Sequence, residues 1–185
     1  MAHSTDVCGV EHAKWLDNGV RRLIHNPQRL FGPYVKRGGT AIDIGCGPGT
    51  FTLGLAKMVG SDGKVIAVDL QRDMLDMTRT KVESAGFGDR VDFHQCKEDE
   101  IGLDVKADFI LTFYMVHETP DPIAFIDQVS ALLAVGGFYY LSEPKFHVSK
   151  RQFDEVLAQC RLRGLSVVKT SGFLSRTAIL QKTEV

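Results

Sequence analysis

The most chemically suggestive residues of this chain form a glycine-rich segment, Asp43-Ile-Gly-Cys-Gly-Pro-Gly49, which follows a short apolar run. Glycine allows positive φ angles and a close backbone approach to a ligand, and a helix that follows offers free N–H groups in its first turn. Asp69 ends the next apolar run, where a carboxylate can accept hydrogen bonds from ribose hydroxyls. These residues predict a site for a nucleotide-like ligand. A glycine turn that serves only to pack a strand against a helix is the alternative.

The elements that must position these residues are short apolar runs that alternate with helical patterns, which is typical of a parallel sheet with crossover helices. Helical stripes cover residues 51–59, 122–133 and 153–160, with Pro122 at a helix start and Gly136-Gly137 at its end. The apolar runs predict strands at residues 40–44, 64–69, 90–94, 107–112 and 137–142, followed by a closing hairpin of strands at 165–170 and 177–181.

The first part of the chain does not follow this alternation. Residues 11–24 have a helical pattern, and Asn26-Pro27 predicts the start of a second short helix. Because residues 1–36 precede the first strand, we expect this helical segment to lie over the mouth of the sheet as a substrate lid. The chain has no internal repeat and no linker-like stretch, so residues 1–185 are expected to form a single domain.

Composition excludes several function classes. The 185 residues carry a net charge of -1, so the basic excess that is typical of nucleic-acid binding is missing. The four cysteines are scattered without a CxxC pair, which favours a reducing compartment, and we expect a cytoplasmic protein. No stretch approaches the roughly 20 apolar residues that a membrane-spanning helix needs.

The motifs along most of the chain resemble those of one enzyme family. The GxGxG spacing, with Asp43 inside the preceding strand, resembles motif I of class I S-adenosylmethionine (SAM)-dependent methyltransferases, and residues 65–70 (VIAVDL) resemble their ribose-binding strand. Residues 107–120 (ADFILTFYMVHETP) and 132–144 (LLAVGGFYYLSEP) resemble motifs of the group that contains ubiquinone/menaquinone C-methyltransferases and arsenite methyltransferases. The resemblance implies a doubly wound, Rossmann-like α/β fold whose seven-stranded sheet is mostly parallel with an antiparallel last strand.

The same resemblance implies which residues contact SAM. The family often has the sequence GDA after its third strand, and the Asp of this motif contacts adenine. Here the aligned residues are Cys96, Lys97 and Glu98, so either Glu98 or a backbone group would take that role. The implied set comprises Asp43, Gly45, Cys46, Gly47 and Gly49 at the methionine end, Asp69 at the ribose, Leu70, Met74 and Glu98 near the adenine, and Phe113 and Tyr114 beside the sulfonium.

Two further groups of residues are candidates for chemistry. His117 follows the fourth strand with Glu118 beside it, and a neutral imidazole suits proton removal from a methyl acceptor. Its alternative role is a hydrogen bond to the backbone. Cys8 and His12 share one helix face at spacing i, i+4 and could bind a soft metal, but two ligands do not complete a site, so we expect ordinary surface or packing residues and no metal.

We therefore expect methyl transfer from SAM to a small-molecule acceptor, with release of S-adenosylhomocysteine (SAH). The acceptor atom stays open, and a homo-oligomer is compatible with the sequence. Two alternatives remain: a SAM-binding protein without catalysis, acting as a sensor or assembly partner, and a nicotinamide-dependent dehydrogenase. The GxGxG spacing and the closing hairpin oppose the second alternative.

Overall fold

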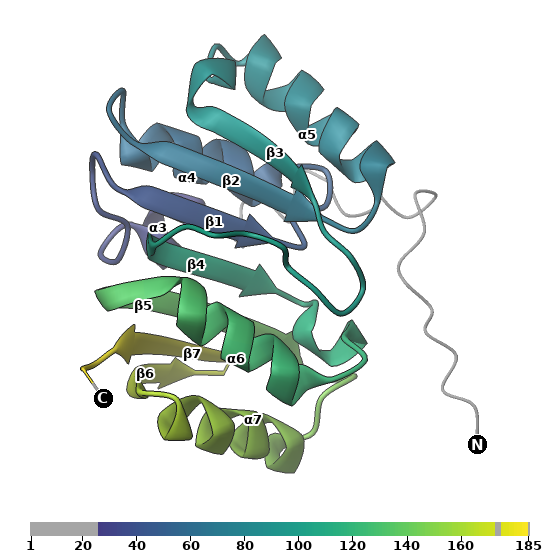
Figure 1. Cartoon of the computed structure of the whole chain (residues 1–185), viewed down its shortest axis with the longest axis vertical. Coiled ribbons are helices and arrows are strands. Elements are labelled where there is room, and N and C mark those ends of the chain that lie inside the picture. The colour runs from purple at the N-terminus through teal and green to yellow at the C-terminus, as the bar shows by residue number, and fades with distance from the viewer. Residues whose placement is uncertain (1–25, 173–174, 185) are drawn as a thin grey trace.

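The centre of the fold is a seven-stranded sheet with the strand order β3-β2-β1-β4-β5-β7-β6 (Figure 1). The computed structural model describes residues 26–172 and 175–184. The helix expected over residues 11–24, together with Cys8 and His12, lies outside this described part. Strands β1 to β5 pair in parallel, whereas β7 is antiparallel to both β5 and β6. The expected doubly wound sheet with an antiparallel last strand is therefore confirmed.

Strands and helices mostly alternate along the chain until the closing hairpin, but β3 is followed by β4 without a helix between them, and α5 is not among the helical stripes that the sequence predicts. The strands are β1 (Thr40–Ile44), β2 (Lys64–Asp69), β3 (Val91–Gln95), β4 (Ala107–Phe113), β5 (Leu133–Pro144), β6 (Leu165–Ser171) and β7 (Ser175–Lys182). The helices are α3 (Pro27–Phe31), α4 (Thr50–Val59), α5 (Arg72–Ser84), α6 (Pro122–Leu132) and α7 (Lys150–Leu162), with 3₁₀ turns η2 (Gly88–Arg90) and η3 (Val116–Glu118). In the part of the chain that the structure describes, no helix is long and apolar enough to cross a bilayer.

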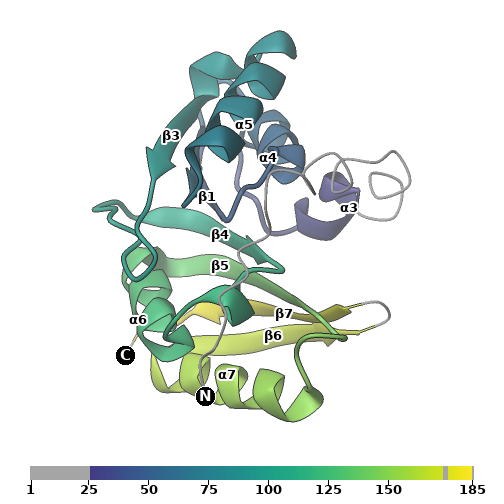
Figure 2. The same ribbon diagram turned by 90° about the vertical axis from the view of Figure 1, so that its right-hand side faces the viewer.

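Helices cover both faces of the sheet, and each face has its own apolar core. Helices α3, α4 and α5 lie on one face, and α6 and α7 lie on the other (Figure 2). Side chains alternate between the faces along a strand, so Ala41 of β1 packs in the core that contains Leu55, while Ile42 packs in the core that contains Ile126. The inner parallel strands β1 and β2 are buried on both sides and are therefore apolar at most positions, whereas the edge strand β3 is only partly buried. Asp43 is a buried exception to this pattern in β1.

The helix starts follow their capping residues. The side chain of Asn26 caps α3 and that of Asp121 caps α6, and in each case a proline, Pro27 or Pro122, occupies the first helical position. Ser149 begins α7 with a complete capping box. The caps of α6 and α7 fix where these helices begin after the loops at the end of β4 and β5.

The prediction from the sequence that α6 continues until Gly136-Gly137 ends it is wrong. The helix ends at Leu132, and β5 begins at Leu133 rather than near residue 137. Leu133 pairs with Ala107 of β4, and the register of the two strands shifts after this pair. Gly136 has a φ of 82° within this irregular part of β5. The glycine pair therefore serves a bend inside the strand, and a continuous apolar run hides the boundary between helix and strand.

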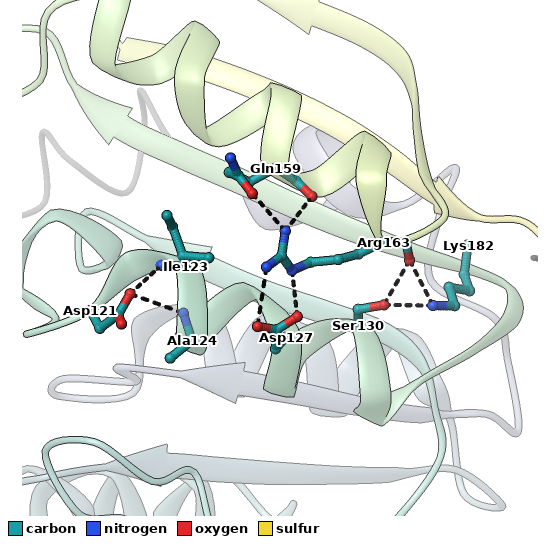
Figure 3. A network of polar contacts seen from close by, with 8 residues as sticks. All are labelled: Asp121, Ile123, Ala124, Asp127, Ser130, Gln159, Arg163 and Lys182. Atoms are coloured by element: carbon teal, nitrogen blue, oxygen red, sulfur yellow. Dashed lines mark hydrogen bonds and ion pairs between the residues drawn. The ribbon is translucent and has the colours of Figure 1, made fainter.

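A polar network fastens α6 to α7 and β7 (Figure 3). Arg163, directly after α7, donates from Nε and Nη2 to the two carboxylate oxygens of Asp127 at 2.5 and 3.1 Å, and from Nη1 to Gln159. Lys182 of β7 donates to the Ser130 hydroxyl at 2.5 Å and to the carbonyl of Arg163 at 2.9 Å. The network holds the C-terminal end of α7, away from the loop that precedes this helix.

The carboxyl ends of β1, β2, β4 and β5 meet at one edge of the sheet because these strands run in parallel (Figure 1). The chain passes from β1 to β2 on one side, and β4 lies on the other side of β1. Ligands of open α/β sheets bind at such a switch point, outside the carboxyl ends of the strands. The loops that gather there are residues 45–49, 70–71, 114–121 and 145–149.

Candidate active site

The glycine-rich loop makes a tight turn between β1 and α4. Gly45, Gly47 and Gly49 have φ angles of 70°, 52° and 76°. A Cβ on Gly49 would stand 2.7 Å from the Thr78 side chain, and a Cβ on Gly45 would stand 2.9 Å from that of Met115. A Cβ on Gly47 would meet no atom of the described residues within 4 Å. Gly47 therefore presents bare backbone to open space, where a ligand can approach closely.

Hydrogen bonds from three directions fix the shape of this loop. The N–H of Gly45 donates to the carbonyl of Val68 at 2.9 Å, and the N–H of Gly47 donates to Oδ2 of Asp69 at 2.9 Å. The hydroxyl of Thr78 in α5 donates to the carbonyl of Gly47 at 2.7 Å. The loop is thus held by β2 and α5.

Asp69 joins the glycine loop to the end of β2. Besides the Gly47 N–H on Oδ2, its Oδ1 accepts the N–H of Gln71 at 2.9 Å. Burial raises the pKa of Asp69, and the backbone N–H groups oppose this rise. A carboxylate has about four lone-pair positions, and the N–H groups of Gly47 and Gln71 approach one oxygen each. Asp69 is 7% exposed and lies where the sequence places a ribose-binding acid.

Asp43 is buried on the face of β1 that α4 covers. Its Oδ2 accepts a hydrogen bond from the Thr52 hydroxyl at 2.6 Å. Burial raises the pKa of Asp43 to about 7, the hydrogen bond from Thr52 opposes the rise, and the charge of Asp69 adds to it. A nearby cation favours the ionised form of such a carboxyl. Asp43 is therefore suited to meet a cationic group of a ligand.

Three other expected contact residues differ in their surroundings. The Sγ of Cys46 lies 3.8 Å from Oγ1 of Thr78, and burial raises the pKa of this thiol, so it packs rather than reacts. Met74 is buried in the first turn of α5. Leu70 is 36% exposed and offers apolar surface directly after Asp69.

Glu98 lies in the loop after β3. The N–H of Cys96 donates to the carbonyl of Asp69 at 3.1 Å, which places the start of this loop beside the end of β2. Lys97 pairs with Glu100 at 2.7 Å, and the Glu98 side chain is exposed. The structure thus brings the loop, but not a buried carboxylate, to the neighbourhood of Asp69.

Aromatic side chains line the end of β4. The ring centroid of Phe113 lies 4.6 Å from that of Phe51 in α4 and 4.2 Å from that of Tyr114. Tyr114 has a φ of 63°, which is uncommon for a residue other than glycine, and its N–H donates to the carbonyl of Ser142 at 2.8 Å. This left-handed residue turns the chain from β4 across the end of β5.

His117 in η3 meets a buried carboxylate from β5. Its Nδ1 lies 2.5 Å from Oε2 of Glu143, and Oε1 of Glu143 accepts the N–H of Val116 at 3.1 Å. The ring of His147, in the loop after β5, has its centroid 5.4 Å from that of His117. The carboxylate that contacts the imidazole is therefore Glu143, not the sequence neighbour Glu118.

The pKa of His117 reflects opposing effects. Burial lowers it, but the hydrogen bond and charge of Glu143, with the charge of Glu118, raise it above its ordinary value overall. Burial raises the pKa of Glu118. A histidine whose protonated form is stabilised in this way can take up a proton from a reacting group.

Sequence reasoning missed Thr52, Thr78 and Glu143. Each contacts a predicted site residue from another element. Glu143 had a signal, because it lies in the LSEP segment of the fifth strand. Thr52 and Thr78 lie on helices without a pattern that distinguishes them from other small polar residues.

Comparison with known proteins gives one family match. A family model described as a methyltransferase domain matches residues 35–179. A demethylmenaquinone methyltransferase of Bacillus subtilis is 27% identical over 128 residues, covering 69% of this chain and 50% of the relative. A ubiquinone biosynthesis O-methyltransferase of Actinobacillus pleuropneumoniae is 29% identical over 145 residues, covering 70% and 59%. The chain spans about half the length of the demethylmenaquinone methyltransferases it matches.

Solved structures that share the fold cover 96–100% of this chain. A SAM-dependent methyltransferase from Aquifex aeolicus has a TM-score of 0.79 at 24% identity and covers 97% of this chain and 98% of its own. A putative SAM-dependent methyltransferase from Methanococcus maripaludis has a TM-score of 0.82 at 19% identity, covering 100% and 98%. The N-methyltransferase NodS from Bradyrhizobium japonicum, solved with SAH, has a TM-score of 0.75 at 15% identity, covering 96% and 94%. At these identities the likeness concerns the fold.

Proposed function

The chain belongs to the methyltransferase domain family, and from this premise we propose that it transfers the methyl group of SAM to a small-molecule acceptor and releases SAH. One observation carries the proposal. At the switch point between β1 and β4, no described residue stands over the bare backbone of Gly47, while its N–H donates to the carboxylate of Asp69. A ribose and the chain attached to it can be held by these two residues together.

The residues at this edge fit the cofactor. The buried carboxyl of Asp43 can pair with the ammonium group at the methionine end, which would favour its ionised form, and Leu70 offers apolar surface for a base. When bound, SAM supplies a methyl group on a positively charged sulfur. The proposed contacts are Asp43, Gly45, Cys46, Gly47 and Gly49 at the methionine end, Asp69 at the ribose, Leu70, Met74 and Glu98 around the adenine, and Phe113 and Tyr114 beside the sulfur.

The acceptor is proposed to be a small molecule. The relatives are named for methylation of quinone precursors, and the net charge of -1 gives no electrostatic support for nucleic acid. A homo-oligomer is the remaining proposal about partners, and light scattering of the purified chain tests it.

His117 is proposed as the group that accepts a proton from the methyl acceptor. Its imidazole lies in the loop that continues from Phe113 and Tyr114, and the carboxylate of Glu143 stabilises the charge that proton uptake creates. Orientation of the two reactants supplies most of the remaining catalysis, because methyl transfer is an in-line displacement.

Residues 1–36 are proposed to cover the acceptor. The loops after β4 and β5 are short, at residues 114–121 and 145–149, so little of the described chain is available for this purpose. Deleting residues 1–25 should weaken methylation. Unchanged SAH binding and unchanged methylation in the truncated chain would contradict this assignment.

Labelled SAM offered with the protein to fractionated cell extract tests the proposed function. We expect the label to enter one small-molecule product with the wild type and not with Gly47→Ala. Tight SAH binding without any labelled product would favour the SAM-binding protein without catalysis. Binding of NADH in place of SAH would favour the nicotinamide-dependent dehydrogenase, which the family match already disfavours.

A further inference from the structure

The carboxylate of Glu143 is almost completely enclosed and has a partner on each oxygen. The residue is 3% exposed at the end of β5. Oε1 accepts the backbone N–H of Val116 at 3.1 Å, and Oε2 lies 2.5 Å from Nδ1 of His117. Two neighbouring residues of η3 are thereby tied to one side chain of β5. The position of the imidazole is set by this pair of contacts.

The contact also decides which imidazole nitrogen is basic. An ionised carboxylate only accepts hydrogen bonds. Nδ1 of His117 must therefore donate, and in the neutral ring the lone pair is left on Nε2. A proton on Nε2 with a bare Nδ1 would place two acceptors 2.5 Å apart, which is repulsive. The geometry thus selects one of the two tautomers.

We propose that Glu143 is a positioning residue that holds His117 in the tautomer with a basic Nε2, so that this nitrogen can take a proton from the methyl acceptor. The inference rests on the proposed function and deepens it. It requires an acceptor whose nucleophilic atom loses a proton, such as a hydroxyl, a thiol, an ammonium group or an activated C–H, and it excludes a thioether or a tertiary amine as the substrate.

The step balances in atoms and charge. The bond between the acceptor atom and its proton breaks, and the proton passes to Nε2 of His117. The electron pair left on the acceptor forms the bond to the methyl carbon, while the pair of the carbon–sulfur bond stays on sulfur. One positive charge therefore disappears from the sulfonium as one appears on the imidazole, beside Glu143.

The groups that face His117 support a charged imidazolium. Glu143 approaches from β5, Glu118 from η3 itself, and the ring of His147 from the loop after β5. Burial alone lowers the pKa of His117, and the two carboxylates more than offset this effect. The ring of His147 lies beside that of His117, but His147 takes no part in the two contacts of Glu143 described above. His147 is therefore a suitable control position.

NMR of the histidine rings tests the inference without any acceptor. The full chain, labelled with 15N at its six histidines, is measured by long-range 1H–15N correlation across pH, and His117→Gln assigns the signal. We expect wild-type His117 to carry its neutral-state proton on Nδ1. In Glu143→Gln the side-chain oxygen can keep the Val116 N–H while the amide donates to Nδ1, so the proton should move to Nε2. In His147→Gln the His117 tautomer should stay as in the wild type.

Kinetics complete the test once a labelled product is known. Glu143→Gln should lower kcat by about 100-fold, in the range of a lost general base, with SAH affinity within about twofold of the wild type. Glu143→Asp should restore part of the activity. An Nε2–H tautomer in the wild type, or an unchanged tautomer in a folded Glu143→Gln, would overturn the inference. A wild-type protein that does not bind SAH would instead overturn the proposed function. The two failures can be told apart because the tautomer of His117 is measured without SAH.

Discussion

The backbone N–H of Gly47 donates to Oδ2 of Asp69 at 2.9 Å. The last residue of β2 therefore holds the loop that follows β1. This contact joins the two parts of the proposed cofactor site. The loop is further fixed by the Thr78 hydroxyl on the Gly47 carbonyl. Hydrogen bonds from β2 and α5 therefore set the conformation of this loop.

Replacing Asp69 should weaken the binding of SAH. Asp69→Ala removes both the proposed ribose contact and the support of the Gly47 N–H, and hydrogen bonds to a charged group contribute about 1.5–3 kcal/mol. We expect an affinity loss of about 10- to 100-fold by calorimetry. Asp69→Asn keeps an oxygen for Gly47 and should lose less. Equal SAH affinity in all three proteins would show that the ribose lies elsewhere.

Gly47→Ala should affect the ligand more than the fold. The new Cβ meets open space, so the cost to stability is that of a left-handed alanine, about 1–2 kcal/mol. Gly38→Ala is the matched control, because Gly38 also has a positive φ, of 75°, with nothing among the described residues within 4 Å of a Cβ, and it precedes β1 at the opposite edge. Both variants should lose similar stability, and only Gly47→Ala should lose SAH affinity, by about tenfold or more. A similar loss of affinity in both would contradict the placement of the ligand.

Gly49→Ala should destabilise the fold. Its φ is 76°, and the Cβ would stand 2.7 Å from Cγ2 and Oγ1 of Thr78. Left-handed strain and overpacking together predict a loss of about 2–3 kcal/mol in the free energy of unfolding. Chemical denaturation of Gly49→Ala in the Thr78→Ala background should show a smaller loss, because both Cγ2 and Oγ1 are gone. The same loss in both backgrounds would place the strain somewhere other than this contact.

SAH binding should depend on pH through Asp43. Burial raises the pKa of this carboxyl to about 7, so below pH 7 it is mostly protonated and cannot pair with an ammonium group. The affinity for SAH should fall by about tenfold per pH unit below this pKa, the slope for one required deprotonation. Calorimetry in buffers of different ionisation enthalpy should detect proton release at pH 6.5. Asp43→Asn should bind SAH more weakly at pH 8, and its affinity should not depend on pH in this way. A wild-type affinity for SAH that does not change between pH 5.5 and pH 8 would contradict the assignment.

His117 should stabilise the fold most at low pH. Its folded-state pKa is raised above the ordinary value near 6.5, so the charged ring paired with Glu143 contributes stability below about pH 6.5. This contribution is lost as the pH rises through the folded-state pKa. The difference in unfolding free energy between the wild type and His117→Gln should therefore shrink from pH 6 to pH 8. A difference that grows over this range would mean that burial lowers the pKa instead.

The order and type of most elements could be predicted from the sequence because local signals agree with the fold. Asn26-Pro27 and Asp121-Pro122 mark helix starts by capping, and the apolar runs mark strands buried on both faces. The boundary between α6 and β5 could not be predicted, since Leu132 and Leu133 are both buried and an apolar run looks the same in either element. The pairing of Leu133 with Ala107 decides it.

The backbone of the site could be predicted more fully than its side-chain partners. The glycine positions and Asp69 have local motifs, whereas Glu143 reaches His117 across 26 residues and Thr78 reaches Gly47 across 31. Such contacts depend on the register of β5 and on the docking of α5. The sequence neighbour of His117, Glu118, therefore does not indicate that Glu143 is the carboxylate that contacts the imidazole.

Titration of the full chain with SAH, followed by calorimetry, tests the central claim most directly. We expect one site per chain in the wild type, clearly weaker binding in Gly47→Ala and Asp69→Ala, unchanged binding in Gly38→Ala, and no heat with NADH. A wild-type protein that is folded and binds no SAH, or that binds it equally well with Gly47 and Asp69 replaced, would contradict a methyl-donor site at the glycine loop.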